Sequence, residues 1–493
     1  MSKRETVRSA GSVYLENFVA FGAGYIYWLI MSKITSTEVI GTSSALISAA
    51  AILSVIASLA IPTGLQRFIA KTYLNGNVSD TRTYVNVSLL LMTAGILCAA
   101  LVALYAQQWI LGSTVPVNLV YISIILIAST SLTSLTRSII VSSLRKSSSL
   151  PLFAIISTVC KIMVGVFLVL IGFGSLGLMI GFTISPVLTS IGLGFISWRL
   201  LRSTSSKELT VTQCLRDIIS SSVSTWVPLI VNTIGSHLGT IVVFGSQGAD
   251  KAAVYFIALS MVLALVTLMS AMFSVAYPVL SAMKDGRKRL AWRAIRMALV
   301  ISSPLSMGIF WFSFETLSIF GQEYARGVTT LQILLLSVVP TMLSTGITTL
   351  MYSYGNYRHV MSIGLASNIP RPLLYILLVP LLNDTGAALS YTIGSLVGLV
   401  FAVQISRKVG LKLFWKEICV ILLVPAAIGI VFKLAGINFI AGILSTLILS
   451  VFAYLFLKVL RKDDIRDSLL VFPPSITNHI VTILNVFSKK RTR

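Results

Sequence analysis

Two basic residues lie in the middle of long apolar segments, one in each half of the chain. Lys161 is surrounded by apolar side chains, and Arg371, flanked by Pro370 and Pro372, lies in a similar run. A charged side chain near the centre of a bilayer is expensive, which makes such a residue a candidate for function. Arginine binds phosphate through a planar fork of hydrogen bonds and lysine as a compact charge. We therefore predict that both bind a phosphate or diphosphate group; the alternative is a structural cation paired with a carboxylate or with backbone carbonyl groups.

The segments that carry these cations repeat one another. Each reads as an apolar helix, a turn and a second apolar helix, and Lys161 precedes Gly177 by 16 residues as Arg371 precedes Gly386 by 15. The stretches after the turns are also alike, GLMIGFTI at 177–184 and GAALSYTI at 386–393. We interpret them as copies of one membrane unit that keeps a cation at mid-depth.

Four other polar residues are candidates for the same cavity. Glu16 and Asn17 lie early in the first predicted helix, where they would serve as counter-ions or as a coupling site for H⁺ or Na⁺, or else lie at the cytoplasmic interface. Asn232 and His237 lie in the seventh helix, the counterpart of the first. For these two, the alternative to a transport role is hydrogen bonding between helices.

Arg67 and Lys71 follow the second apolar segment at its inner end. We predict a cytoplasmic mouth that attracts an anionic headgroup; the alternative is the ordinary excess of basic residues on the inside.

The sequence contains no motif for catalysis. It has no G-x-x-x-x-G-K-[ST] loop and no H-E-x-x-H pair. Four cysteines stand singly, without the spacing of a zinc site or a disulfide framework (Cys98, Cys160, Cys214 and Cys419). A membrane glycosyltransferase or polymerase would need acidic residues on substantial loops, whereas the acids here are scattered on short ones. We predict a transporter rather than an enzyme, with no catalytic residue, metal or cofactor.

The composition fits this prediction. Of 493 residues, 56% are hydrophobic and 11% charged, and the mean hydropathy is +0.92. Such a chain is an all-α polytopic membrane protein, because each segment in lipid must satisfy its own backbone hydrogen bonds. The net charge of +23 would indicate nucleic acid in a soluble protein. In a membrane protein the positive-inside rule explains it, so we expect no nucleic-acid partner and no cleaved signal peptide.

Fourteen transmembrane helices are predicted, grouped as six, six and two. They cover roughly 12–31, 39–61, 84–106, 117–136, 150–171, 177–198, 218–244, 252–280, 297–320, 328–350, 361–382, 386–405, 418–434 and 438–457. With a cytoplasmic N-terminus, 32 of the 38 Lys and Arg residues fall in inner segments and four in outer ones. This bias places both termini in the cytoplasm.

Two units of six helices with the same polarity form a parallel repeat around a central cavity. We assign 1–205 to the N-terminal lobe, 206–408 to the C-terminal lobe, 409–462 to helices 13 and 14, and 463–493 to a cytoplasmic tail. From Ser475 the tail has the apolar spacing of an amphipathic helix and ends in a basic cluster, which suits a membrane surface.

Together these features resemble the multidrug/oligosaccharidyl-lipid/polysaccharide (MOP) exporter superfamily, and within it the polysaccharide-transporter flippases. The marks are the six, six and two layout, IPTGLQRFIA at 61–70 with its echo AYPVLS at 276–281, and the glycines that open the sixth and twelfth helices. The resemblance implies alternating access. It also implies translocation of a polyprenyl- or dolichyl-(pyro)phosphate-linked oligosaccharide from the cytoplasmic to the outer leaflet of the cell membrane, for surface polysaccharide or glycoprotein assembly.

The alternative is a cation-coupled exporter of the multidrug and toxin-extrusion type. Such exporters need carboxylates inside the membrane, where this chain has cations. As partners we expect the lipid-linked oligosaccharide, membrane lipids and the glycan polymerase or glycosyltransferase machinery, and we expect a monomer.

Overall fold

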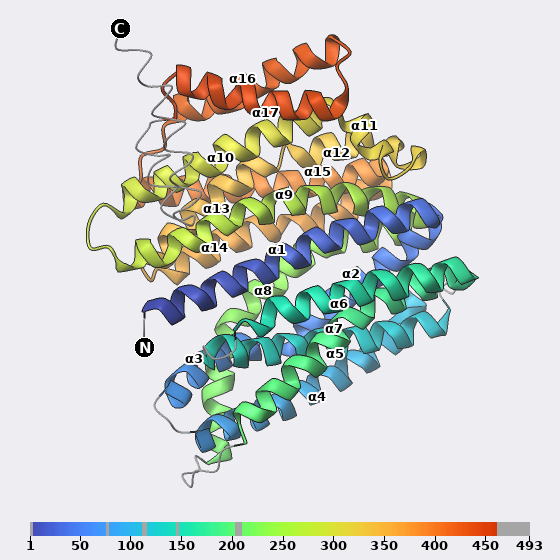
Figure 1. Cartoon of the computed structure of the whole chain (residues 1–493), viewed down its shortest axis with the longest axis vertical. Helices are drawn as coiled ribbons and strands as arrows, with labels where there is room; N and C mark the ends of the chain where they lie inside the picture. Colours follow the sequence, from blue (N-terminus) through green and yellow to red (C-terminus); the bar gives the residue numbers. More distant parts are fainter. Residues whose placement is uncertain (1–2, 75–77, 111–115, 144–146, 203–209, 461–493) are drawn as a thin grey trace. The chain divides into compact units, whose positions relative to one another are not determined.

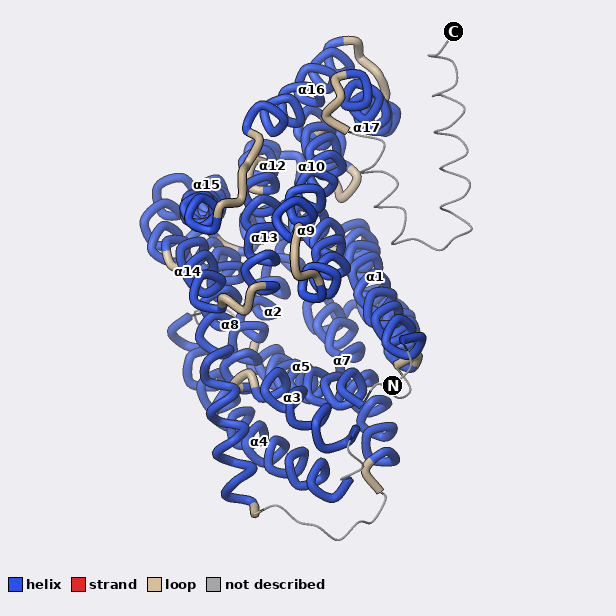
Figure 2. Tube along the Cα trace, turned by 90° about the vertical axis from the view of Figure 1, so that its left-hand side faces the viewer, coloured by secondary structure: helices blue, strands red, loops and turns tan. Residues whose placement is uncertain are grey.

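The computed structural model describes residues 3–74, 78–110, 116–143, 147–202 and 210–460. Within these ranges every regular element is a helix, and the loops between the helices are short (Figures 1 and 2). The all-α fold predicted from composition is therefore confirmed, while the tail with its predicted amphipathic helix lies outside the described residues. The elements are α1 (Lys3–Ile34), α2 (Thr37–Ser58), α3 (Ile61–Leu74), α4 (Val78–Ile110), α5 (Val117–Ser143), α6 (Ser149–Leu168), η1 (Val169–Phe173), α7 (Gly174–Leu200), α8 (Val211–Gln247), α9 (Ala249–Ala282), α10 (Arg287–Trp311), α11 (Ser313–Ser318), η2 (Gln322–Gly327), α12 (Val328–Leu335), α13 (Val338–Ser353), α14 (Tyr357–Asn368), α15 (Pro370–Val409), α16 (Trp415–Leu434) and α17 (Phe439–Phe456).

Eleven segments of the described chain are long and apolar enough to cross a membrane. Two of them, Ser149–Leu200 with 52 residues and Tyr357–Val409 with 53, are long enough for two crossings each. Each contains a break at the predicted turn, with φ of +95° at Gly172 and +56° at Asn383. Glycine adopts this left-handed region freely, and asparagine does so more readily than most residues. Counting these two segments twice and adding α1 gives the fourteen predicted crossings.

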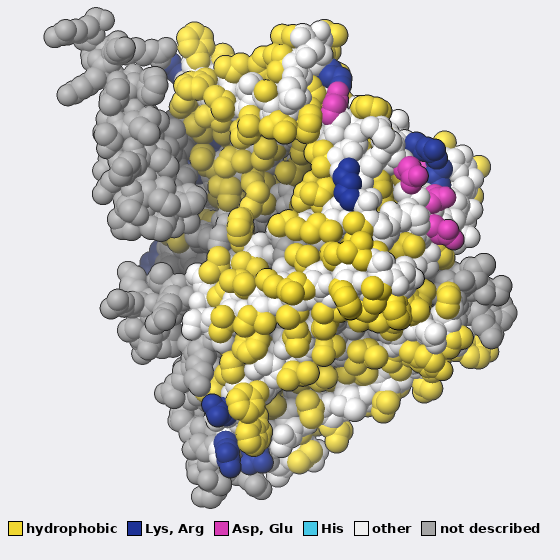
Figure 3. Space-filling model, turned by 45° about the vertical axis from the view of Figure 1, so that its right-hand side comes forward, with side chains coloured by type: hydrophobic (Ala, Val, Ile, Leu, Met, Phe, Trp, Pro, Cys, Tyr) yellow, Lys and Arg dark blue, Asp and Glu magenta, His cyan; other side chains and the backbone are white. Residues whose placement is uncertain are grey.

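The surface agrees with a bilayer environment. On the face drawn in Figure 3, hydrophobic side chains predominate and charged ones are few. On α6, Met163 and Phe167 are 66% and 63% exposed. Apolar side chains this exposed are suited to contact with lipid rather than water.

The two hairpins that carry the cations pack in the same register. A Cβ atom at Gly177 would lie 2.9 Å from the carbonyl carbon of Leu168, and one at Gly386 would lie 2.2 Å from the carbonyl oxygen of Leu378. Leu168 and Leu378 each lie seven residues after the cation of their copy. The helices thus meet at equivalent points, and the one-residue difference between the copies falls in the turn.

The chain forms two compact units by its internal contacts. The first comprises Met1–Ala264, Leu317–Leu334 and Gly364–Ser395, and the second comprises Leu265–Thr316, Leu335–Ile363 and Leu396–Arg493. Every candidate site residue predicted from the sequence belongs to the first unit. Each unit is made of three separate stretches of the chain, so this division says nothing about the lobe boundaries at 205 and 408. Those boundaries stay predictions.

In the second unit, α16 and α17 pack against α10. The Arg296 guanidinium, which is 4% exposed, lies 3.3 Å from the Glu417 carboxylate. The Trp311 indole donates to the Ala426 carbonyl oxygen at 3.0 Å, and Lys433 pairs with Glu315. This buried cation of α10 is therefore balanced by an acid of α16.

Candidate functional site

Lys161 is buried on α6 and lies against aromatic rings from two other helices. Its side chain is 8% exposed, and its Nζ atom lies 3.9 Å from the ring centroid of Phe182 on α7 and 4.5 Å from that of Tyr27 on α1. Among the described residues it makes no hydrogen bond and no ion pair. The ring faces attract the ammonium group through their quadrupoles without cancelling its charge.

Small residues allow the helices around Lys161 to pack closely against one another. Gly165 follows Lys161 by one turn, and a Cβ atom at Gly181 would lie 2.4 Å from its Cα atom. The Tyr27 hydroxyl donates to the carbonyl oxygen of Leu178 at 2.7 Å. These contacts fix α1, α6 and α7 around the ammonium group.

Arg371 is equally buried, at 5% exposure, and is held by polar and aromatic partners. Its Nη1 donates to Asn368 Oδ1 at 2.8 Å and its Nη2 to Ser395 Oγ at 2.9 Å. Its Cζ atom lies 3.8 Å from the ring centroid of Tyr391. The Nε atom is buried and finds no acceptor in the described part of the chain, so its N–H remains unused.

Both cations lie over the same aromatic position of the repeat. Phe182 and Tyr391 are each the sixth residue of the matching stretches 177–184 and 386–393. The ring distances of 3.9 Å and 3.8 Å are nearly equal. Neither cation pairs with a carboxylate among the described residues, so the arrangement keeps two positive charges in an apolar setting. Neither aromatic residue was predicted to belong to the site, although an aromatic residue at the same place in both copies was a usable signal.

Asn232 joins the Arg371 side of the site. Asn368 Nδ2 donates to Asn232 Oδ1 at 3.4 Å and to the Gly364 carbonyl oxygen at 2.9 Å. Since Asn368 Oδ1 accepts from Arg371, one hydrogen-bonded chain runs from α8 to the guanidinium. The Tyr375 hydroxyl adds a bond from α15 to the Gly235 carbonyl oxygen at 2.9 Å. Asn368, the central link, was missed because a single asparagine in a sequence shows no partner.

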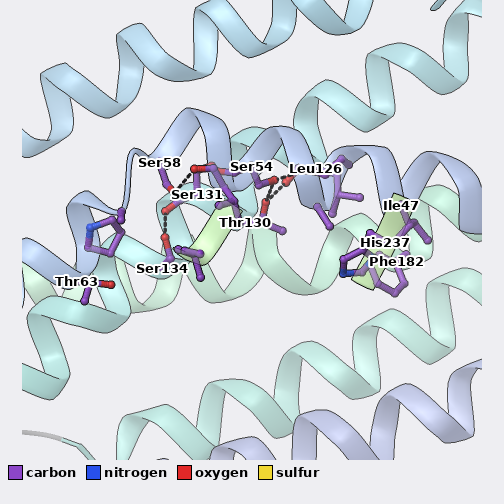
Figure 4. A pocket seen from close by; sticks show the side chains of 16 residues that line it. Ile47, Ser54, Ser58, Thr63, Leu126, Thr130, Ser131, Ser134, Phe182 and His237 are labelled. Atoms are coloured by element: carbon purple, nitrogen blue, oxygen red, sulfur yellow. Dashed lines mark hydrogen bonds between the residues drawn. The ribbon is translucent and has the colours of Figure 1, made fainter. Parts of the chain in front are cut away.

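His237 lies in a cavity of about 440 Å³ (Figure 4). The walls come from α2, α5 and the start of α3, with Phe182 from α7 and two residues of α8. Phe182 therefore belongs both to this cavity and to the contact with Lys161. The lining residues are Ile47, Ala50, Ala51, Ser54, Val55, Ser58, Ala60, Pro62, Thr63, Leu126, Thr130, Ser131, Ser134, Phe182, Leu229 and His237.

Of the remaining candidates, Glu16 has a partner other than the two cations. The Glu16 carboxylate accepts from Arg137 Nε at 2.9 and 3.0 Å, and thus has a partner on α5 that the sequence did not indicate. Asn17 is exposed. Arg67 and Lys71 belong to α3, but their side chains lie outside what the structure describes. No group of three or more potential metal ligands occurs among the described residues.

Comparison with known proteins places this geometry in context. Residues 45–329 match a family model described as polysaccharide biosynthesis protein. No curated protein matches the sequence.

Solved structures share the fold at low identity. The lipid II flippase MurJ, in an inward closed conformation, superposes with a TM-score of 0.75 at 15% identity, covering 90% of this chain and 98% of its own. An inward-facing multidrug resistance MATE family transporter of the MOP superfamily gives 0.61 at 16%, covering 83% and 94%. A MOP superfamily transporter from Pyrococcus furiosus, described as having a binding pocket of reverse polarity, gives 0.52 at 16%, covering 82% and 95%. These likenesses confirm the polytopic fold predicted from the sequence.

Proposed function

Because the chain belongs to the polysaccharide biosynthesis protein family, within the MOP superfamily of transporters, we propose that it is a flippase for a phosphate- or diphosphate-linked glycolipid. It moves the headgroup of a polyprenyl- or dolichyl-linked oligosaccharide from the cytoplasmic to the outer leaflet by alternating access. It acts in the cell membrane as a monomer with both termini in the cytoplasm, next to the glycosyltransferases or the polymerase of its pathway. It carries out no chemical reaction, and its coupling ion, if it uses one, is H⁺ or Na⁺.

The observation that carries this proposal is the pair of cations held over aromatic rings. A cation that only stabilises helix packing is usually matched with an acid, as Arg296 is with Glu417. Lys161 and Arg371 are instead held by rings and neutral polar groups. This arrangement orients the positive charges while leaving them free to attract an anion. A phosphate or diphosphate group is the anion that the family's glycolipid substrates supply.

The exporter of cations is the weaker candidate. It would need a carboxylate with no cationic partner in the membrane interior. In the described part of the first unit, the buried Asp384 lies 3.5 Å from Lys251 Nζ and accepts from Thr330 Oγ1 at 2.5 Å. Glu16 is paired with Arg137. Both acids already have partners, so the described site favours an anionic ligand.

A binding measurement tests the phosphate assignment. Purified protein in nanodiscs is titrated with farnesol, farnesyl phosphate and farnesyl diphosphate, and the ratio of the farnesol Kd to the farnesyl diphosphate Kd defines the phosphate preference. A hydrogen bond to a charged group is worth about 1.5–3 kcal/mol, roughly a 10- to 100-fold change in affinity. Lys161→Gln and Arg371→Gln should each reduce the preference by at least about tenfold. Lys33→Gln, which removes an exposed cation at the end of α1, should leave it unchanged.

Two further arms define the substrate. Inorganic diphosphate should compete poorly, because a lipid-linked substrate also contributes apolar contacts. In proteoliposomes, a fluorescent polyprenyl diphosphate sugar should cross the membrane with the wild-type protein and not with either Gln variant. An unchanged phosphate preference in both variants would refute the site. Equal displacement by inorganic diphosphate would indicate a transporter of free anions.

A further inference from the structure

The cavity beside Phe182 has walls that offer hydrogen-bond acceptors. The Ser134 hydroxyl donates to the Ser131 carbonyl oxygen of its own helix at 2.7 Å (Figure 4). The Ser54 and Thr130 hydroxyls lie 2.8 Å apart, so one donates to the other, and the carbonyl oxygens of Ala50 and Leu126 lie within hydrogen-bond distance of them at 2.6 and 2.7 Å. A hydroxyl group has one hydrogen and two lone pairs. Since these hydrogens are used within the protein, the remaining lone pairs of the oxygens can accept hydrogen bonds from a ligand.

Among the lining residues that the structure describes, no side chain is an acid, a lysine or an arginine. This described wall therefore offers no carboxylate to bind a cationic ligand and no permanently charged cation to bind an anionic one. The Lys161 ammonium group, 3.9 Å from the ring of Phe182, further opposes a cation at this place. Neutral ligands that donate hydrogen bonds fit this chemistry.

Of the described lining residues, His237 carries the imidazole, and this side chain has no hydrogen-bond partner among the described residues. Its ring lines the cavity, as that of Phe182 does (Figure 4). A neutral imidazole has one donor and one acceptor, and leaving both unused in a partly buried place costs free energy. A ligand with hydroxyl groups would satisfy both atoms.

We propose that this cavity binds an uncharged sugar residue of the substrate, the one attached next to the phosphate. Its volume of about 440 Å³ lies within the range of roughly 300–1,000 Å³ typical of small-molecule sites. Phe182 places the sugar beside the phosphate, because the same ring contacts Lys161 and lines the cavity. This assignment rests on the proposed function and extends it to the class of glycan: neutral at the first residue rather than acidic or basic.

The competing occupant is the prenyl chain, because much of the wall is apolar. Ile47, Val55 and Leu126 would suit a hydrocarbon. A hydrocarbon, however, would leave the imidazole of His237 without a partner and would remove the Ser and Thr oxygens from water without replacing its hydrogen bonds. The sugar accounts for both the apolar and the polar residues, since its ring has C–H faces and hydroxyl edges.

The test compares three ligands that differ by one part each: farnesol, farnesyl diphosphate, and farnesyl diphosphate carrying one neutral hexose or N-acetylhexosamine. Their Kd values give a phosphate preference and a separate sugar preference for every variant. Ser134→Ala and His237→Leu should reduce the sugar preference by roughly 2- to 10-fold each, the value of a neutral hydrogen bond. The phosphate preference should not change.

Ser138→Ala is the matched control. Ser138 lies one turn beyond Ser134 on α5 and donates to its own helix in the same way, to the Leu135 carbonyl oxygen at 2.8 Å, but it does not line the cavity. Its replacement should leave both preferences unchanged. A second variant, Ala51→Leu, fills the cavity and should abolish the sugar preference while farnesyl diphosphate still binds.

Three results would overturn the inference. Equal losses for all three ligands in Ala51→Leu would show that the cavity holds the prenyl chain. A wild-type sugar preference that is absent, or greater for a uronic acid than for a neutral hexose, would show that no neutral subsite exists. Unchanged sugar preferences in Ser134→Ala, His237→Leu and Ala51→Leu would place the sugar elsewhere. The proposed function fails separately, when Lys161→Gln and Arg371→Gln leave the phosphate preference intact.

Discussion

Replacing Lys161 with methionine should make the protein more stable and inactive at once. Lys161 is 8% exposed and has no acidic partner among the described residues. Removing an ion from water costs several kcal/mol in a protein interior. The two ring contacts, with Phe182 and Tyr27, return only about 0.5–2 kcal/mol each. A net penalty remains, so an apolar side chain of similar length should stabilise the fold by roughly 1–3 kcal/mol.

The same substitution at two other buried cations should have different effects. Arg371→Met removes the charge but also two hydrogen bonds, to Asn368 and Ser395, each worth about 1.5–3 kcal/mol, so no stabilisation is expected. Arg296→Met leaves the Glu417 carboxylate without its partner and should destabilise by about 3–5 kcal/mol. Lys161→Met should therefore be the most stable of the four proteins, wild type and Arg371→Met should be intermediate, and Arg296→Met should be the least stable.

Thermal unfolding in nanodiscs at one scan rate, followed by tryptophan fluorescence, measures this order. A fixed scan rate matters because membrane proteins often unfold irreversibly. Transport of a fluorescent polyprenyl diphosphate sugar is measured in parallel, and Lys161→Met should lose it. A Lys161→Met protein that is less stable than wild type would show that the ammonium group is compensated in the folded state. The positive charge of Lys161 would then not be free to attract an anion.

Three other changes test separate parts of the structure. Gly386→Ala should lower the midpoint of thermal unfolding more than Gly177→Ala does, because its Cβ atom would meet a backbone oxygen at 2.2 Å rather than a backbone carbon at 2.9 Å. Gly364→Ala is the control and should be neutral, because nothing lies within 4 Å of its Cβ atom. Equal effects of the three substitutions would contradict the packing of the hairpins. Phe182→Leu should reduce the phosphate preference only about 2- to 10-fold, whereas Phe182→Glu should abolish it by neutralising Lys161. A phosphate preference retained in the Glu variant would refute the role of the charge. Truncation before Asp467 should leave most transport activity in proteoliposomes, because the predicted amphipathic tail only assists anchoring, and a complete loss would disprove this.

The hairpins and their cations were predictable because their signals are local. A lysine or an arginine in an apolar run is visible without any knowledge of packing. The turns were marked by glycine and asparagine, which tolerate the left-handed backbone found at Gly172 and Asn383. The repeat itself was evident from the spacing of Gly177 and Gly386.

The partners of the charges were not predictable, because they depend on which helix faces touch. Arg137 and Glu16 are 121 residues apart, and so are Arg296 and Glu417. From sequence, Arg296 resembled the other basic residues of an inner loop, yet it is 4% exposed. The cavity likewise requires α2, α5, α7 and α8 to meet, which no single segment reveals.

Under the proposed function, the two cations that lie over aromatic rings would make the transport cycle sensitive to voltage. Moving one elementary charge through a potential of 100 mV changes the free energy by about 2.3 kcal/mol. A diphosphate bound to Lys161 and Arg371 would largely cancel their charge. The conformational change of the loaded protein would then move almost no net charge through the electric field. The empty protein would carry both charges back. A membrane that is negative inside would therefore favour the return of the empty site to the cytoplasmic side, and would thereby drive the proposed cycle toward export.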